Sequence, residues 1–123
     1  MLKKNSLLQS EELSNMVVKG MQEKKAQDII VLDLRKVANS VADFFVICSG
    51  SSDTQVGAIA ESVEDSIHKA DKQNPWHKEG NRNNEWILLD YVDVVAHVFI
   101  KNRREFFALE DLWGDAKITK IAS

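Results

Sequence analysis

The sequence holds a single cysteine, a single proline and five glycines among its 123 residues. One cysteine excludes a disulfide within the chain and any zinc module built from several cysteines. Because Cys48 lies inside the apolar run 44–48, we expect it to be a small buried side chain rather than a nucleophile. So few prolines and glycines leave little room for a flexible linker, and the length is typical of one domain. We therefore predict one domain over residues 1–123, with loose tails at 1–9 and 116–123.

Long hydrophobic runs are also missing. None approaches the roughly 18 residues that a membrane helix needs, and the N-terminal lysines are not followed by the apolar segment of a secretion signal. Acidic residues outnumber basic ones, 19 against 16, so the formal net charge is −3. Such a chain lacks the general attraction to phosphate on which most nucleic-acid binders depend. We expect a cytoplasmic protein that makes little or no direct contact with nucleic acid and does not enter a membrane.

Helical periodicity is present in three segments. The range 10–24 carries an apolar stripe at spacings of three and four, and we expect Ser10 to be its N-cap. A second helix is predicted from Ser52 to Ala70, because the sequence at 52–55 matches a capping box and apolar residues then recur at helical spacing. A third helix is expected to begin near residue 102.

Short β-branched runs lie between these helices and predict strands. Two runs are nearly continuous in apolar character, which is typical of strands covered on both faces. Two later runs are separated by a few residues, which predicts a hairpin with its turn inside 90–93. The expected strands are 28–34, 44–49, a short edge strand at 76–79, 86–91 and 93–100. Strands do not alternate strictly with helices, so we predict an α/β fold with a mixed sheet flanked by helices rather than a Rossmann repeat.

Gly50-Ser51-Ser52 ends a predicted strand and opens a helix, where it is either a helix cap or a phosphate site. In nucleotidyltransferases a Gly-Ser pair at this position accompanies catalytic carboxylates two residues apart on one strand. Here Asp90 and Asp93 are three apart and flank a turn, and Asp28 and Asp33 are five apart. Neither pair has the required spacing, so we predict no catalytic residues. The protein is expected not to be an enzyme.

The histidines do not form a ligand set. His68, His77 and His97 show no metal-binding spacing, so we predict neither a metal nor a cofactor. His97 alternates with Val95 and Phe99 along one strand, which indicates a hydrogen-bonded histidine in or near the core.

Aromatic residues flanked by carboxylates indicate a surface for a basic protein partner. Trp86 begins a predicted strand, and Tyr91 lies at the hairpin tip between Asp90 and Asp93. Aromatic side chains anchor interfaces and charges steer them. We expect Tyr91 to be exposed, since a hairpin tip is hard to bury. For Trp86 two interpretations stay open, exposure on the surface or packing under a helix.

Several stretches, taken in their order and spacing, match one family over residues 10–116. The matching stretches are 25–34, 42–52, 79–80, 86–91, 93–99 and 104–113. The sequence resembles the ribosomal silencing factor family (RsfS, also called Iojap-like or YbeB proteins). This resemblance implies a nucleotidyltransferase-like α/β fold without catalytic carboxylates.

The resemblance also implies a function. It implies binding to ribosomal protein L-fourteen on the large ribosomal subunit, at the face that meets the small subunit. Occupying that face would block subunit association and repress translation when nutrients are scarce. It further implies that the protein is a homodimer when free.

The residues carried over from the family lie in or near the predicted hairpin. Trp86 and Tyr91 would be apolar contacts, and Asp90 and Asp93 would face basic groups. Weaker candidates for partner binding are Glu79 and Lys78. We assign no role to the connection at 74–77.

One position departs from the family pattern. The family usually has glycine where this chain has Val92. Glycine permits a positive φ that valine disfavours, so we expect the turn to differ in shape. Two alternative functions stay open, an assembly factor of the large subunit and a nucleotide-binding enzyme that uses residues 50–52.

Overall fold

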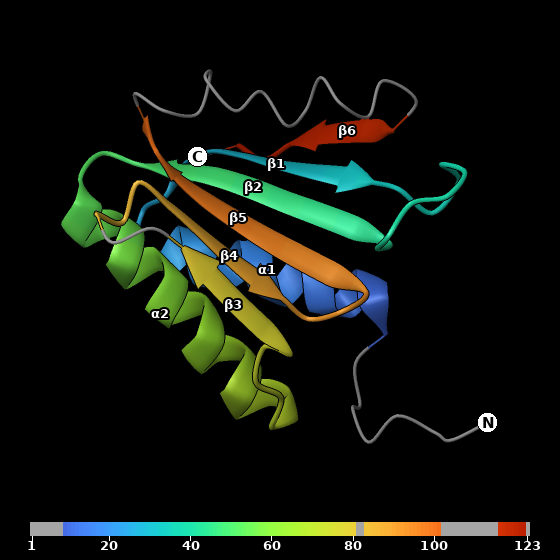
Figure 1. The fold of residues 1–123 in the computed structure, drawn as a ribbon, viewed down its shortest axis with the longest axis horizontal. Helices are drawn as coiled ribbons and strands as arrows, with labels where there is room; N and C mark the ends of the chain where they lie inside the picture. Colours follow the sequence, from blue (N-terminus) through green and yellow to red (C-terminus); the bar gives the residue numbers. More distant parts are fainter. Residues whose placement is uncertain (1–8, 81–82, 102–115, 123) are drawn as a thin grey trace.

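The structure, a computed structural model, describes residues 9–80, 83–101 and 116–122 of the chain. Two helices and six strands lie within these ranges, and the strands form one sheet (Figure 1). In chain order the elements are α1 (Ser10–Glu23), β1 (Gln27–Asp33), β2 (Phe44–Gly50), α2 (Asp53–Asp71), β3 (His77–Gly80), β4 (Trp86–Asp90), β5 (Val94–Ile100) and β6 (Lys117–Lys120). The α/β class predicted from the sequence is confirmed.

The sheet is mixed, also as predicted. Its strand order is β3-β4-β5-β2-β1-β6, with β2 and β5 parallel and the other four pairs antiparallel. The parallel pair occupies the middle of the sheet, and every residue of β2 is buried. Burial on both faces explains why the sequence of β2 is continuously apolar instead of alternating. Cys48 is 0% exposed at the centre of this strand, which confirms its expected burial.

Both helices cover the same face of the sheet (Figure 1). They contact each other closely at Gly20 of α1, where a Cβ atom would lie 2.8 Å from the Cα of Val63 in α2. The Ser62 hydroxyl donates a buried hydrogen bond of 2.8 Å to the Gly20 carbonyl at the same point. Glycine is therefore required at this position by the distance between the helix backbones, although it disfavours a helix interior.

A second hydrophobic cluster lies on the opposite face of the sheet. It includes Phe45, Ile47 and Phe99, with Trp86 and Leu88 packed against it in partly buried positions. No helix among the described residues combines the length and apolar character that crossing a membrane requires.

Two boundary predictions were wrong. The expected C-terminal tail contains β6, which pairs with β1 in antiparallel register from Asp33↔Lys117 to Ile30↔Lys120. The N-cap of α1 is Gln9 rather than Ser10, and the Gln9 N–H donates to Glu12 Oε1 at 3.1 Å. The predicted third helix and most of the expected N-terminal tail fall outside the described residues.

Candidate functional site

The hairpin turn between β4 and β5 is the centre of the predicted partner surface. The Asp93 N–H donates to the Tyr91 carbonyl at 3.0 Å, and Val92 between them has a φ of 76°. A bond across two residues with this φ defines a γ-turn of the strained, rarely seen form. Valine therefore adopts the positive φ that we expected it to avoid.

Hydrogen bonds on both sides hold this turn. The Asp90 carboxylate accepts from the Val92 N–H at 2.7 Å, and the Asp90 carbonyl accepts from the Trp76 N–H at 2.8 Å. The Asp93 carbonyl accepts from the N–H of Asp43 at 2.7 Å. The turn is thus tied to the segment before β3 and to the segment before β2.

The prediction that Tyr91 is exposed was wrong. Tyr91 is 3% exposed and belongs to the cluster under the helices. Its hydroxyl has no hydrogen-bond partner among the described residues. Burial, and secondarily the charge of Glu64, raise the pKa of Tyr91 well above its ordinary value. A neutral, buried tyrosine holds the hairpin against α2 and presents no surface to a partner.

The alternation of β4 explains why Trp86 and Tyr91 do not lie together. Successive strand residues point to opposite faces, so residues at odd separations lie on different sides. Leu89 and Tyr91 pack on the helix side, whereas Trp86 and Leu88 pack on the other side. Trp86 is therefore not under α1 or α2, and the interpretation that placed it beneath a neighbouring helix does not hold for these two helices.

Trp86 stacks on the side chains of β5. Its ring centroid lies 6.4 Å from that of Phe99 and 6.5 Å from that of His97, with interplanar angles near 20°. The Trp86 indole N–H donates to His97 Nδ1 at a long 3.4 Å. His97 is buried, as predicted, and its Nε2 has no hydrogen-bond partner within the described ranges. Burial lowers the pKa of His97 to about 4, so the ring is neutral at pH 7.

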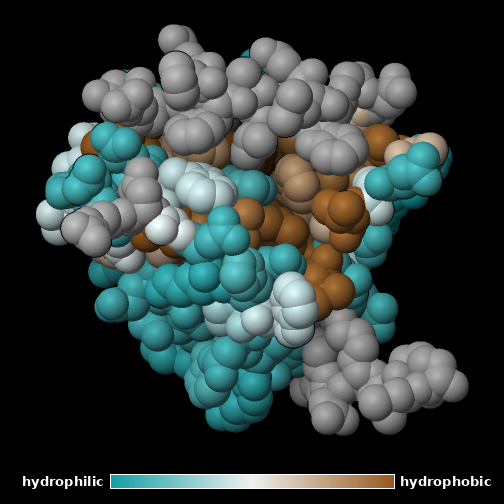
Figure 2. All heavy atoms as spheres, in the orientation of Figure 1, coloured by the Kyte–Doolittle hydropathy of each residue, from teal (hydrophilic) through white to brown (hydrophobic). Residues whose placement is uncertain are grey.

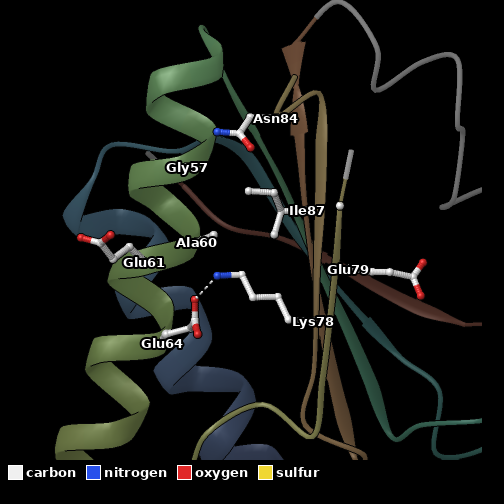
Figure 3. Close-up of a pocket in the computed structure, with 9 residues that line it drawn as sticks. Gly57, Ala60, Glu61, Glu64, Lys78, Glu79, Asn84 and Ile87 are labelled. Carbon is white, nitrogen blue, oxygen red and sulfur yellow. Dashed lines mark hydrogen bonds and ion pairs between the residues drawn. The ribbon is translucent and has the colours of Figure 1, made fainter. Parts of the chain in front are cut away.

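The two weaker candidates lie on β3 and point in opposite directions. Lys78 Nζ pairs with Glu64 Oε2 of α2 at 2.8 Å, across a cleft of about 360 Å³. Figure 3 shows Lys78 directed toward α2 and Glu79 directed away from it. Glu79 Oε2 lies 2.7 Å from His77 Nε2 on that outer side. Because Glu79 pairs with Leu88 across the sheet and His77 with Asp90, these residues share a face with Trp86.

The structure thus brings Trp86, Asp90 and Glu79 together on one face of β3 and β4. It places Tyr91 and Lys78 toward α2, and Asp93 in the turn itself. The odd spacing between Trp86 and Tyr91 was the signal in the sequence that could have separated them.

At residues 50–52, where a phosphate site was one interpretation, the Ser51 amide is already hydrogen-bonded within the chain. The Ser51 N–H donates to Gln55 Oε1 at 2.6 Å, and the Ser51 hydroxyl donates to the same oxygen at 2.8 Å. Ser52 Oγ accepts from the Gln55 N–H at 3.1 Å, which confirms the predicted cap. Gln55 Nε2 then donates to the carbonyl of Lys24, so this turn joins the two helices. Among the described residues no group of three His, Cys, Asp or Glu side chains could hold a metal ion.

Comparison with known proteins gives the family. The model of the family described as "Ribosomal silencing factor during starvation" matches residues 8–123. The chain is 44% identical over 101 residues to the ribosomal silencing factor RsfS of Bacillus subtilis (strain 168), covering 80% of this chain and 82% of that protein. A crystal structure of a protein from Chromobacterium violaceum is similar with a TM-score of 0.81 and 31% identity, covering 94% of this chain and 95% of that chain. The chain belongs to the ribosomal silencing factor family.

A more distant relative carries a different name. The mouse (Mus musculus) protein "Mitochondrial assembly of ribosomal large subunit protein 1" is 30% identical over 115 residues. The match covers 89% of this chain and 50% of the mouse protein.

Proposed function

We propose that this protein binds ribosomal protein L-fourteen on the large ribosomal subunit and blocks association with the small subunit, which represses translation under nutrient limitation. Membership of the ribosomal silencing factor family supports the proposal. The observation that carries it is the outer face of β3 and β4, which Trp86 shares with Asp90 and Glu79. An aromatic group flanked by negative charge fits a basic protein surface.

Charge favours a protein contact over an RNA contact. The chain has a net charge of −3, and ribosomal RNA is a polyanion, so a general attraction between the two is absent. A local contact with a basic ribosomal protein avoids this repulsion. Once bound, the protein would occupy the face of the large subunit that meets the small subunit and so prevent the two from joining. This mechanism requires no catalytic residue and no cofactor.

Within this proposal the predicted contact residues have different roles. Trp86, Asp90, Glu79 and Asp93 would contact the partner. Tyr91 would act from inside, by fixing the hairpin on α2. Lys78 is held by Glu64 and would orient β3.

A second candidate function is assembly of the large subunit. The name of the mouse relative, which refers to mitochondrial assembly of the ribosomal large subunit, favours this function. Both functions use a contact with the large subunit, and they differ in whether mature subunits are prevented from joining.

Co-sedimentation with purified large subunits tests the contact. We expect the wild-type protein to migrate with the large subunit and not with the small subunit. Glu79→Lys with Asp90→Asn should weaken binding, because the first reverses a charge and the second removes one while keeping the acceptor oxygen for Val92. Asp65→Lys, an exposed charge reversal on α2, is the matched control and should bind normally. Equal binding by all three proteins would refute the assigned face, and absence of wild-type binding would refute the function.

A further inference from the structure

Large apolar side chains are exposed at few places in the described part of the chain, and most of these places lie together. The four side chains are Val41 at 76%, Trp76 at 76%, Val92 at 55% and Ile118 at 46% exposure. Ile118 lies on β6, at one edge of the sheet. The other three come from separate segments that meet at the β4–β5 turn.

Backbone hydrogen bonds join these three segments. Trp76 donates its N–H to the carbonyl of Asp90, directly before the turn. Val92 is the central residue of the turn, and the carbonyl of Asp93 after it accepts from the N–H of Asp43. Val41 precedes Asp43 by two residues. In Figure 2 hydrophobic atoms gather over this end of the sheet, where β2 and β5 begin. We call Val41, Trp76 and Val92 the apolar triad.

The turn that carries Val92 of the triad is strained and held by hydrogen bonds. Val92 has a φ of 76°, and both of its neighbours are held by backbone hydrogen bonds. A positive φ is unfavourable for a β-branched residue, and such strain is concentrated at binding sites and switches. Here the strained backbone holds the apolar side chain of Val92 in solvent, where it adds little to the stability of the folded monomer.

The charges around the triad are acidic. Asp43, Asp90 and Asp93 lie within the same hydrogen-bonded turn region. Arg35 also reaches this end, 4.8 Å above the Phe44 ring, but it is bonded to the Asp33 carboxylate at 2.7 Å and 2.9 Å. Apolar groups with carboxylates around them fit a partner that presents basic side chains beside an apolar patch.

Two other occupants fit less well. A second copy in a two-fold contact would set the same carboxylates against each other, because the same patch is used on both sides. Single-stranded RNA could stack a base on Trp76, but its phosphates would meet the same carboxylates.

We propose that the apolar triad is the anchor of a docking surface for a basic protein, with Trp76 as its principal contact. This inference rests on the proposed function, since it names the part of the chain that seats the ribosomal protein. It adds three residues at the β4–β5 turn to the contact that Trp86, Asp90 and Glu79 form on the outer face. It also assigns the principal contact to Trp76, which is exposed, whereas Tyr91 is buried.

Binding of Trp76→Ala to purified large ribosomal subunits, measured with a fluorescent label on the protein, tests the inference. Trp76 is largely exposed and its backbone N–H remains, so the variant should fold; circular dichroism and thermal unfolding check this. We expect Kd to rise about tenfold or more, as for a truncated tryptophan hot spot. Val41→Ala should have a smaller effect in the same direction. Ile118→Ala is the matched control and should bind like the wild type.

The possible outcomes distinguish a failure of this inference from a failure of the proposed function. Wild-type binding that survives Trp76→Ala unchanged overturns the inference and leaves the proposed function standing. No binding by the wild type overturns the proposed function itself. A Trp76-dependent change in the protein's own oligomeric state during gel filtration would assign the triad to a second copy. Trp76-dependent binding to isolated ribosomal RNA would assign it to nucleic acid, and either result overturns the basic-protein partner.

Discussion

Glycine and alanine at position 92 should differ in stability, and the backbone geometry of the turn decides which variant is the more stable. At ordinary backbone angles glycine is less stable than alanine by about 0.5–1 kcal/mol, because the unfolded glycine chain has more freedom to lose. At a positive φ the Cβ atom of alanine costs about 1–2 kcal/mol, which glycine avoids. Val92 has a φ of 76°, so the second effect should exceed the first. We expect Val92→Gly to be more stable than Val92→Ala by about 1 kcal/mol.

Comparing glycine with alanine removes the side chain beyond Cβ from both variants, so lost packing cancels. Val41 is the control position, because it is also exposed and is not among the described residues with positive φ. There the order should reverse, with Val41→Gly less stable than Val41→Ala by about 0.5–1 kcal/mol. Urea unfolding followed by circular dichroism measures all four variants, and 1 kcal/mol corresponds to a few degrees in Tm for a chain of this size. Alanine matching or exceeding glycine at position 92 would refute the strained γ-turn.

Three further predictions follow from buried groups. His97 should make folding sensitive to acid, because its pKa in the folded protein is about 4, below the ordinary 6.5. The contribution of the neutral ring to the free energy of unfolding is therefore intact above pH 6.5 and is lost as the pH falls toward 4. The pKa difference corresponds to a loss of about 3 kcal/mol in the free energy of unfolding. Urea unfolding measured at several pH values should show that His97→Phe lacks this decrease. Tyr91→Phe should unfold at the same or higher urea concentration than the wild type, because it removes a buried hydroxyl without a partner in the described structure. Tyr91→Ala should lower the free energy of unfolding by about 3–5 kcal/mol, because it leaves a cavity. Gly20→Ala should lower the stability by about 1–3 kcal/mol, since the new methyl group would meet the α2 backbone; unchanged thermal unfolding would contradict the close helix contact.

The pattern of residues close in sequence was sufficient to predict most of the helices and strands. The apolar spacing in α2 and the cap at Ser52 depend on residues close in sequence, and both were predicted. The strand β6 was not, because its four residues are exposed and mostly polar, and only pairing with the distant β1 makes them a strand. A non-local pairing of this kind leaves no periodic signal in the sequence.

The site was harder to predict for a related reason. The environment of Trp86 is set by Phe99 and His97 on β5, and the register between the strands decides which residues these are. Tyr91 was misplaced because we took it as part of the turn, whereas its side chain continues the buried alternation of Leu89. Trp76 was overlooked in a polar connection, since only the bond of its N–H to Asp90 shows that it lies beside the hairpin.

If this protein prevents the ribosomal subunits from joining, as we propose, a sedimentation assay will detect the effect. Purified large subunits are incubated with the protein, small subunits are added at a magnesium concentration that normally drives association, and the products are separated on a sucrose gradient. We expect fewer joined ribosomes as the protein concentration rises, with the protein in the large-subunit fraction and a weaker effect for Trp76→Ala. Normal joining while the protein stays bound to the large subunit would refute the proposed block of subunit association and favour the assembly function.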